Sequence, residues 1–334
     1  MATAGGTPAA AGDNLKRLTD LYRMMVRIRT FEETALEAYK AGEIPGPLHV
    51  SFGQEAIPSG VCASLRTDDR LTSNHRGHGH ALAKGADAAT MYLELYGREG
   101  GYCRGKGGSM HIADFSVGML GANGVVAGGL PIAVGAAQGL KLLKSDAIVV
   151  CMFGDGATNR GPYLEALNWA AIYTLPVLFV CEDNGVAAHT ETRTVTAGEG
   201  PAVRANAIGV PAVTIDGNDA LAVEETAARL VAEIRAGRGP RMIHAKTYRW
   251  SGHTATDAAA WRDPMQVEAA KARCPIARLK SVMIERGVAS AALDDIIAAA
   301  REEMQAGRAG AHAAPWPGMA SAFEDVQDSG AVHG

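Results

Sequence analysis

The apolar positions of this chain are grouped most clearly between residues 147 and 181. Two short runs, 147–153 and 177–181, are rich in β-branched residues and have the continuous apolar character of strands buried in a parallel sheet. Between them, residues 163–173 carry apolar side chains at helical spacing. A strand, a helix and a second strand in this order predict a right-handed crossover between parallel strands.

Similar patterns predict elements on both sides of this unit. The remaining predicted elements are strands at 210–215 and 241–248 and helices at 14–42, 131–141, 220–235 and beyond 264. The helix at 131–141 is dense in glycine and alanine, so we expect it to be buried in a core or against a partner subunit. The polar stretch 187–205, rich in threonine and glycine, predicts a mobile loop. The chain is therefore expected to have an α/β fold with helical extensions at both ends.

The two strands of the crossover each end in a residue that can bind a metal ion. Asp155 stands between Gly154 and Gly156 after the first strand, and Asn184 follows the second, with 27 residues between Gly156 and Asn184. Ligands bind past the carboxyl ends of parallel strands, so these two side chains are expected to converge. Carboxylate and amide oxygens suit magnesium, whose shell is usually completed by substrate phosphates and water. We therefore predict a site for a magnesium-bound diphosphate.

A second polar segment, residues 71–80, contains three histidines and one arginine. His75, His78 and His80 could form a zinc cluster, but their short glycine-rich spacing fits a closed tetrahedral site poorly. A solvated loop is the plain alternative. We favour a phosphate-facing loop, because Arg76 offers a forked set of donors and the glycines permit close approach.

Composition and charge narrow the class of protein. The 334 residues are 47% hydrophobic with a net charge of −4, which is typical of a soluble globular protein and disfavours binding to nucleic acid or an anionic membrane. No apolar run reaches transmembrane length. Five scattered cysteines without a CxxC pair favour a reducing cytoplasm. The first 14 residues lack the features of a signal peptide and predict a disordered leader.

Four ordered motifs resemble the α subunits of thiamine diphosphate-dependent 2-oxo acid dehydrogenases, of the pyruvate and acetoin dehydrogenase type. They are the GQEA segment at 53–56, GANGVV at 121–126, GDG at 154–156 with Asn184, and YRWSGH at 248–253. The resemblance implies the thiamine diphosphate-binding fold, a parallel sheet with helices on both faces. It implies a single domain over 15–326, between the leader at 1–14 and a tail at 327–334.

The resemblance also implies the cofactors, thiamine diphosphate and Mg²⁺, and the residues that hold them. The implied metal ligands are Asp155, Asn184 and the carbonyl oxygen of Val186. The implied cofactor contacts are His75, Arg76, Gly124, Val126, Asp155, Gly156, Ala157, Asn184 and His253. His253 is further implied as a catalytic residue that faces the reacting centre. In some relatives the residues corresponding to Thr254 and Thr256 are phosphorylated.

Thiamine enzymes need a glutamate that activates the pyrimidine ring of the cofactor. The sequence offers only Glu55 and Glu182 next to its motifs, and we interpret both as structural residues. We therefore expect the glutamate on a β subunit, in an α2β2 heterotetramer that passes acyl groups to a lipoyl acyltransferase. Two alternatives remain open. One is a dinucleotide-binding oxidoreductase, although Asn159 occupies the place of the third glycine of that motif, and the other is a non-catalytic subunit.

Overall fold

The computed structural model describes residues 8–324, with side chains described from residue 14, and its core is a sheet of six parallel strands. The strands lie in the order β2-β1-β3-β4-β8-β7. Their bounds are β1 (Arg70–Thr72), β2 (Met119–Gly121), β3 (Val149–Gly154), β4 (Val177–Asp183), β7 (Ala212–Asp216) and β8 (Arg241–Lys246). The strand–helix–strand unit predicted at 147–181 therefore forms the centre of the sheet.

The central strands are buried on both faces, which explains their continuous apolar sequence. Val149 is paired with Val177, and Cys151 with Phe179. Because successive side chains alternate between the two faces, Cys151 and Phe179 pack in one apolar cluster, while Val150 packs in another on the opposite face. Cys151 is fully buried, as its position in an apolar run predicted.

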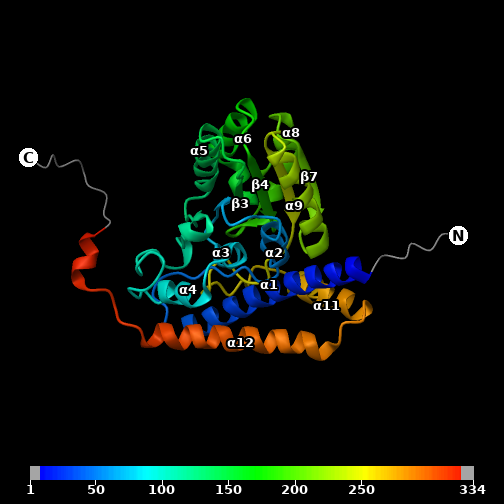
Figure 1. Cartoon of the computed structure of the whole chain (residues 1–334). Coiled ribbons are helices and arrows are strands. Elements are labelled where there is room, and N and C mark those ends of the chain that lie inside the picture. Colours follow the sequence, from blue (N-terminus) through cyan, green and yellow to red (C-terminus); the bar gives the residue numbers. More distant parts are fainter. Residues whose placement is uncertain (1–7, 325–334) are drawn as a thin grey trace, which may run out of the picture.

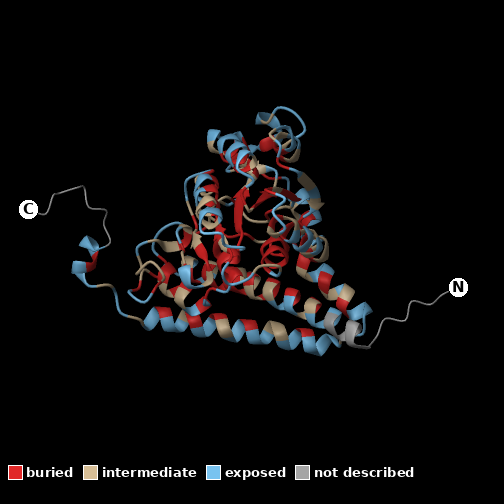
Figure 2. Cartoon of the chain, turned by 45° about the horizontal axis from the view of Figure 1, so that its top comes forward, coloured by how far each residue is buried: buried red, intermediate tan, exposed pale blue. Residues whose placement is uncertain are grey.

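Helices cover both faces of the sheet, which confirms the predicted fold class (Figure 1). On one face lie α5 (Gly129–Leu142), α6 (Gly161–Ile172) and α8 (Pro201–Ala207). On the other lie α2 (Ala56–Cys62), α3 (His78–Lys84), α4 (Ala88–Leu95) and α9 (Ala220–Arg235). In Figure 2, buried residues are concentrated in the sheet and on the inner faces of these helices.

Long helices from the two ends of the chain lie side by side below the sheet (Figure 1). They are α1 (Pro8–Lys40) and α12 (Ser290–Ala313). α11 (Pro275–Glu285), which follows α10 (Pro264–Lys271), also packs against α1. The predicted disordered leader is wrong for residues 8–14, because α1 begins at Pro8. Proline is well tolerated at the first helical position, and the alanines after it favour helix. The rest of the leader, 1–7, and the tail at 327–334 lie outside the described residues.

The stretch 187–205 contains regular structure, so the loop predicted there is wrong. It holds the hairpin of β5 (Val186–Ala187) and β6 (Thr190–Glu191), the short helix α7 (Thr192–Val195) and the start of α8. Thr194 Oγ1 donates to the Glu191 carbonyl, and Arg204 donates to the Thr158 carbonyl. These side-chain bonds to the backbone leave no periodic signal in the sequence.

Short 3₁₀ helices occur elsewhere in the described chain. They are η1 (Gly108–Met110), η2 (Phe115–Val117), η3 (Asp155–Asn159) and η4 (Met319–Phe323).

A partly exposed ion pair connects α12 to the turn after α1, and its loss should destabilise the fold. Arg308 in α12 donates two hydrogen bonds, of 3.0 and 2.9 Å, to the carboxylate of Glu43, which also accepts one from Tyr96. These donors lower the pKa of Glu43 to about 2. We expect Glu43→Gln to lower the free energy of unfolding by about 1–3 kcal/mol at pH 7, as for hydrogen bonds to charged groups.

The pH dependence of the stability difference between the parent chain and Glu43→Gln tells the loss of the ion pair from a loss of packing. The folded pKa of Glu43 lies below the value of the unfolded chain, so its stabilisation is present above pH 5 and is lost as the pH falls toward 2. The urea unfolding curves of the two proteins should therefore differ at pH 7 and converge as the pH is lowered toward 2. Glu37→Gln is the control, because its carboxylate is 63% exposed and lies 3.5 Å from Arg308. Equal losses in both variants would contradict the prediction.

Candidate functional site

A cavity of about 270 Å³ lies at the carboxyl ends of the central strands. Its walls come from the segments that follow β1, β3, β4 and β8 and from the loop before α5. The predicted site residues that line it are His75, Arg76, Val126, Asp155, Gly156, Ala157, Asn184, Val186 and His253. Gly124 is not among the lining residues, although its neighbours Asn123 and Val125 are. The fold therefore assembles the predicted site from five separate stretches of chain.

Asp155 is the buried acid of the cavity. It begins η3 directly after β3 and is 4% exposed. Its Oδ2 atom has no hydrogen-bond partner among the described residues. Burial raises the pKa of Asp155 to about 6, helped by the neighbouring carboxylate of Asp183. An acid with a free buried oxygen is suited to bind a cation.

Asn184 and the start of β5 complete the oxygen-rich wall. The Asn184 side-chain oxygen accepts a 3.3 Å hydrogen bond from the amide of Val186, while its amide group donates to Gln54. This second bond fixes the orientation of the side chain, with its oxygen toward the turn. At Gly156, an added Cβ atom would lie 2.7 Å from the Cβ of Ala187. Glycine is therefore required there so that the turn after β3 can approach the hairpin.

The lining of the cavity also has a basic part, with two buried arginines. Arg76 donates to the carbonyl oxygens of Val50 and His253, at 2.7 and 2.8 Å. Burial lowers the pKa of Arg76 to about 10. Burial and repulsion from Arg76 lower the pKa of Arg249, which is 1% exposed, to about 9. Two guanidinium groups held close together in this way favour an anion in the cavity.

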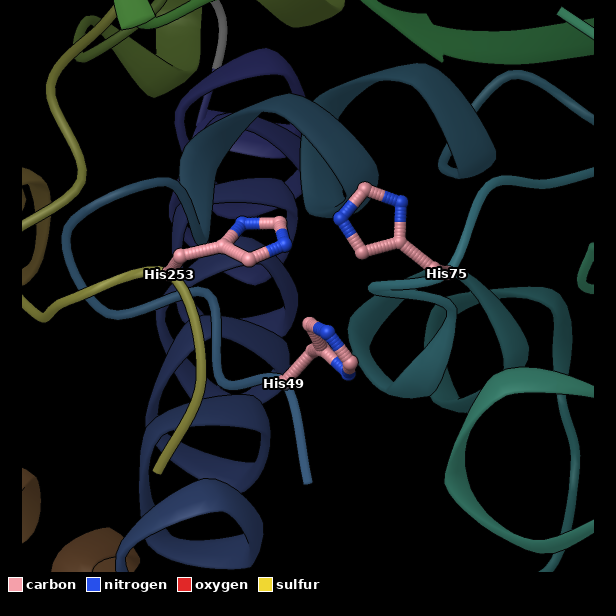
Figure 3. A group of neighbouring side chains, drawn as sticks. All are labelled: His49, His75 and His253. Atoms are coloured by element: carbon pink, nitrogen blue, oxygen red, sulfur yellow. The ribbon is translucent and has the colours of Figure 1, made fainter. Parts of the chain in front are cut away.

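Three histidines meet beside these arginines (Figure 3). The ring centroid of His49 lies 5.0 Å from that of His75 and 5.1 Å from that of His253, and the last two are 5.7 Å apart. Burial, with repulsion from Arg76, lowers the pKa values of His49, His75 and His253 to about 3, 2 and 4. All three imidazoles are therefore neutral at pH 7.

The zinc cluster considered for His75, His78 and His80 does not form. His78 lies 3.2 Å from Glu32 and 3.0 Å from the hydroxyl of Ser109. His80 lies 3.1 Å from Glu182 and 2.6 Å from Ser73. Because α3 begins at His78, the helix directs these two side chains into separate buried networks. His75, in the turn before α3, joins His49 and His253 instead.

Sequence reasoning missed several residues of the site. Gln54, Asn74 and Arg249 line the cavity, and His49 lies in the histidine group. Gln54 and Arg249 belong to the GQEA and YRWSGH segments, so the motifs themselves held the signal for them. His49 and Asn74 carry no such signal, because their roles depend on which segments the fold brings together.

The two glutamates that stand next to the motifs are hydrogen bonded within the protein. Glu55 accepts from Arg29 and from the backbone amide of Gly53, at 2.6 and 3.0 Å. Glu182 lies at the cavity wall, but its two oxygens contact His80 and Asn74. Both are engaged as structural residues, which agrees with the interpretation from sequence. Both oxygens of Glu182 are therefore occupied, whereas Oε2 of Glu55 has no partner among the described residues but does not line the cavity.

The cavity thus combines two chemically different sets of residues. Its lining includes oxygen ligands for a hard cation, at Asp155 and Asn184, and cationic donors, at Arg76 and Arg249. A polyanion that carries its own metal ion suits both sets, because the metal can bind the oxygens while the phosphate oxygens accept from the arginines. This is the arrangement expected for a magnesium-bound diphosphate.

Comparison with known proteins finds the same family in a family model and in individual relatives. The family model described as "Dehydrogenase E1 component" matches residues 22–319. The α subunit of acetoin:2,6-dichlorophenolindophenol oxidoreductase from Bacillus subtilis (strain 168) is 40% identical over 307 residues, covering 92% of each chain. Its counterpart from Cupriavidus necator is 40% identical over 327 residues, covering 97% of this chain and 98% of that protein.

A chloroplastic relative shows that the similarity extends to another named enzyme. The pyruvate dehydrogenase E1 component subunit alpha-3 of Arabidopsis thaliana is 37% identical over 314 residues, covering 92% of this chain and 73% of that protein. The family match, over residues 22–319, begins within α1 and includes every segment that lines the cavity. This chain therefore belongs to the dehydrogenase E1 component family.

Proposed function

We propose that this chain is the α subunit of a thiamine diphosphate-dependent dehydrogenase that acts with a β subunit in an α2β2 heterotetramer. It decarboxylates a pyruvate-like 2-oxo acid or cleaves acetoin, and passes the acyl group to a lipoyl-bearing acyltransferase. The observation that carries the proposal is the cavity whose lining combines Asp155 and Asn184 with Arg76 and Arg249, in a chain of this family. Both alternatives, a dinucleotide enzyme and a non-catalytic subunit, are less compatible with this site.

The residues present fit magnesium and the diphosphate. Asp155 has a free buried oxygen, and the side-chain oxygen of Asn184 is oriented by its neighbours. These two oxygens and the Val186 carbonyl would hold Mg²⁺. The backbone of Gly156 and Ala157 would contact the diphosphate, as would Arg76 and His75, whose Nε2 atom lacks a partner among the described residues.

When bound, thiamine diphosphate supplies a nucleophilic carbon and an electron sink for breaking a carbon–carbon bond. The residues of this chain bind and orient it. His253 is positioned by a 2.6 Å hydrogen bond from its backbone amide to Asp257, and Arg76 contacts its ring at 3.2 Å. A neutral imidazole in this position can orient the diphosphate and donate or accept one proton at the reacting centre. Val126, with Gly124 behind it, would lie beside the pyrimidine ring.

We infer that the pyrimidine-activating glutamate comes from a partner subunit, because both oxygens of Glu182 are engaged and Glu55 does not line the cavity. An exposed apolar surface supports a partner subunit as its source. It begins at the cavity mouth with Val126, which is 51% exposed, and continues over α5 and α6 to Trp169, which is 49% exposed. Its other members are Val125, Ile132, Leu142, Leu143, Leu164, Ile172 and Tyr173. Large exposed apolar surfaces of this kind mark protein interfaces.

The choice between substrates rests on the relatives. Two relatives at 40% identity are named for acetoin, and the Arabidopsis relative is named for pyruvate.

The cellular location is proposed to be the cytoplasm. In support, all five cysteines are free, as suits a reducing compartment. Among residues 8–324, no helix is long and apolar enough to cross a membrane.

The requirement for a β subunit can be tested with purified proteins. The gene for this chain is expressed alone and together with a β-type partner from the adjoining reading frame. Reduction of 2,6-dichlorophenolindophenol is then measured with pyruvate or acetoin, thiamine diphosphate and Mg²⁺. We expect turnover only in the co-purified complex, because the glutamate for the pyrimidine ring is proposed to come from the partner.

Two results would overturn the proposal. Full turnover by the isolated chain would show that no partner supplies the glutamate. Thermal stabilisation of the complex by NAD, with none by thiamine diphosphate and Mg²⁺, would favour the dinucleotide alternative. The second measurement needs no substrate and therefore separates cofactor binding from catalysis.

A further inference from the structure

His49, His75 and His253 come from three segments that are distant in the sequence, and their rings converge (Figure 3). One ligand atom from each lies within 4.8 Å of the other two. His49 is 6% exposed, and His75 and His253 are partly buried. Ring nitrogens of His75 and His253 point toward one another, and His49 approaches them from one side (Figure 3).

Each imidazole has a nitrogen to offer. Nδ1 of His49 and Nε2 of His75 are buried and have no hydrogen-bond partner among the described residues. Nδ1 of His253 lies 3.2 Å from Arg76, which leaves its Nε2 atom for another partner. Buried nitrogens without partners are costly, and the three rings are close enough for one ligand to contact all of them.

We propose that His49, His75 and His253 form a binding site for a borderline transition-metal dication of the Zn²⁺ class. Three imidazole nitrogens with one open position are a recurrent zinc coordination set. For a triangle with 4.8 Å sides, the centre lies about 2.8 Å from each atom. A zinc–nitrogen bond measures about 2.0–2.1 Å. Each ring therefore needs to move inward by less than about 1 Å.

The arginine beside the site determines its fourth ligand. The Arg76 guanidinium adjoins His253, so a dication there is repelled unless an anion accompanies it. Hydroxide, favoured because zinc lowers the pKa of bound water, or another small anion would occupy the open position. Binding through Nε2 of His253 places the ring proton on Nδ1 and ends that contact with Arg76. Arg76 keeps its 2.8 Å bond to the His253 carbonyl.

The site is chemically distinct from the oxygen wall at Asp155. Magnesium prefers oxygen ligands, whereas imidazole nitrogen selects zinc, copper or nickel. Two of the three histidines line the cavity, however. If the proposed function is correct, the transition metal and the diphosphate compete for His75 and His253. A trace metal would then inhibit loading of the cofactor.

Co²⁺ is the probe, because its visible absorption is far stronger in a tetrahedral nitrogen site than in an octahedral oxygen site. The full-length chain is stripped with chelator, exchanged into buffer containing excess Mg²⁺ and titrated with Co²⁺. We expect a strong tetrahedral spectrum that saturates at one Co²⁺ per chain and is displaced by Zn²⁺. His49→Ala should weaken Co²⁺ affinity at least about 100-fold, since even second-shell changes cost 10–100-fold.

Matched variants show whether Co²⁺ binds at the three histidines, at Asp155 or at an exposed histidine. His312→Ala, an exposed histidine at the end of α12, and Asp155→Asn should both retain the spectrum. Loss of the signal in Asp155→Asn, or its persistence in His49→Ala, would overturn the proposal. Circular dichroism and thermal unfolding of His49→Ala exclude misfolding as the cause, and His49→Gln provides a second test of the same nitrogen.

Competition is measured by adding thiamine diphosphate with Mg²⁺ to the Co²⁺-loaded chain in complex with its partner. We expect loss of the tetrahedral spectrum. Calorimetry with the metal-free complex shows whether thiamine diphosphate binds at all. If it binds but leaves the Co²⁺ spectrum unchanged, the claim that metal and diphosphate compete for His75 and His253 is overturned. Absence of calorimetric binding would instead count against the proposed function, and the Co²⁺ site would stand on the titration alone.

Discussion

Replacing Asp155 by asparagine is expected to lower turnover of the assembled enzyme about 100-fold to 1000-fold. The amide keeps the size of the side chain but removes the negative charge that would hold Mg²⁺ at the diphosphate. Removing one partner from a buried charged contact costs about 2–5 kcal/mol, and each 1.4 kcal/mol corresponds to a factor of ten. The measurement is dye reduction at saturating substrate, together with the Mg²⁺ concentration needed for half-maximal activity.

The same variant should not destabilise the metal-free fold. The folded pKa of Asp155 is raised to about 6, above the value of about 3.9 for an unfolded aspartate, so its ionisation costs stability as the pH rises through this range. In chelator at pH 7.5, Asp155→Asn should be at least as resistant to urea as the parent chain, and the difference should vanish near pH 4. A variant that loses both activity and stability would contradict this account.

Replacing Arg76 by methionine should weaken thiamine diphosphate binding about 100-fold. This guanidinium is 6% exposed, and it ties together the segments at Val50 and His253 at the basic wall of the cavity. Removing it takes away charge-assisted donors to the diphosphate, which are among the stronger protein hydrogen bonds. Calorimetric titration of the co-purified complex with thiamine diphosphate, at fixed Mg²⁺, gives the change in affinity.

Two further variants separate charge from geometry. Arg76→Lys keeps the charge but loses the planar fork, so its affinity should fall between those of the parent and of Arg76→Met. Arg66→Met is the control, because Arg66 is an exposed residue that pairs with Asp68 and Asp146 away from the cavity. Unchanged affinity in Arg76→Met would remove this residue from the cofactor site.

The sequence was informative where a physical pattern is local. Continuous apolar runs at 147–153 and 177–181 predicted β3 and β4, because strands buried on both faces require apolar residues at every position. The amphipathic pattern at 220–235 predicted α9 with its observed bounds. The polar turns after β3 and β4 placed Asp155 and Asn184 at the same edge of the sheet, since parallel strands share one carboxyl end.

The sequence was less informative for segments whose apolar residues do not repeat at helix or strand spacing. The start of α1 at Pro8 and the hairpin at 186–191 depend on local propensity and on side-chain bonds to the backbone. Neither leaves a repeating arrangement of apolar residues. His78 and His80 show the same limit, because their spacing alone could not tell a shared cluster from two separate networks on α3.

By itself, the sequence determined the class of fold and placed Asp155 and Asn184 past the ends of two neighbouring strands, because parallel strands share one carboxyl end. Arg76 was predicted as a phosphate-facing residue from its residue type and the glycines around it, without the strand β1 that precedes it. Only the tertiary structure decided which distant segments meet. It brought His49 beside His75 and His253, added Arg249 to the basic wall and removed Gly124 from the lining. Such contacts depend on how helices and loops pack around the sheet, and that packing is not encoded in any single stretch of chain.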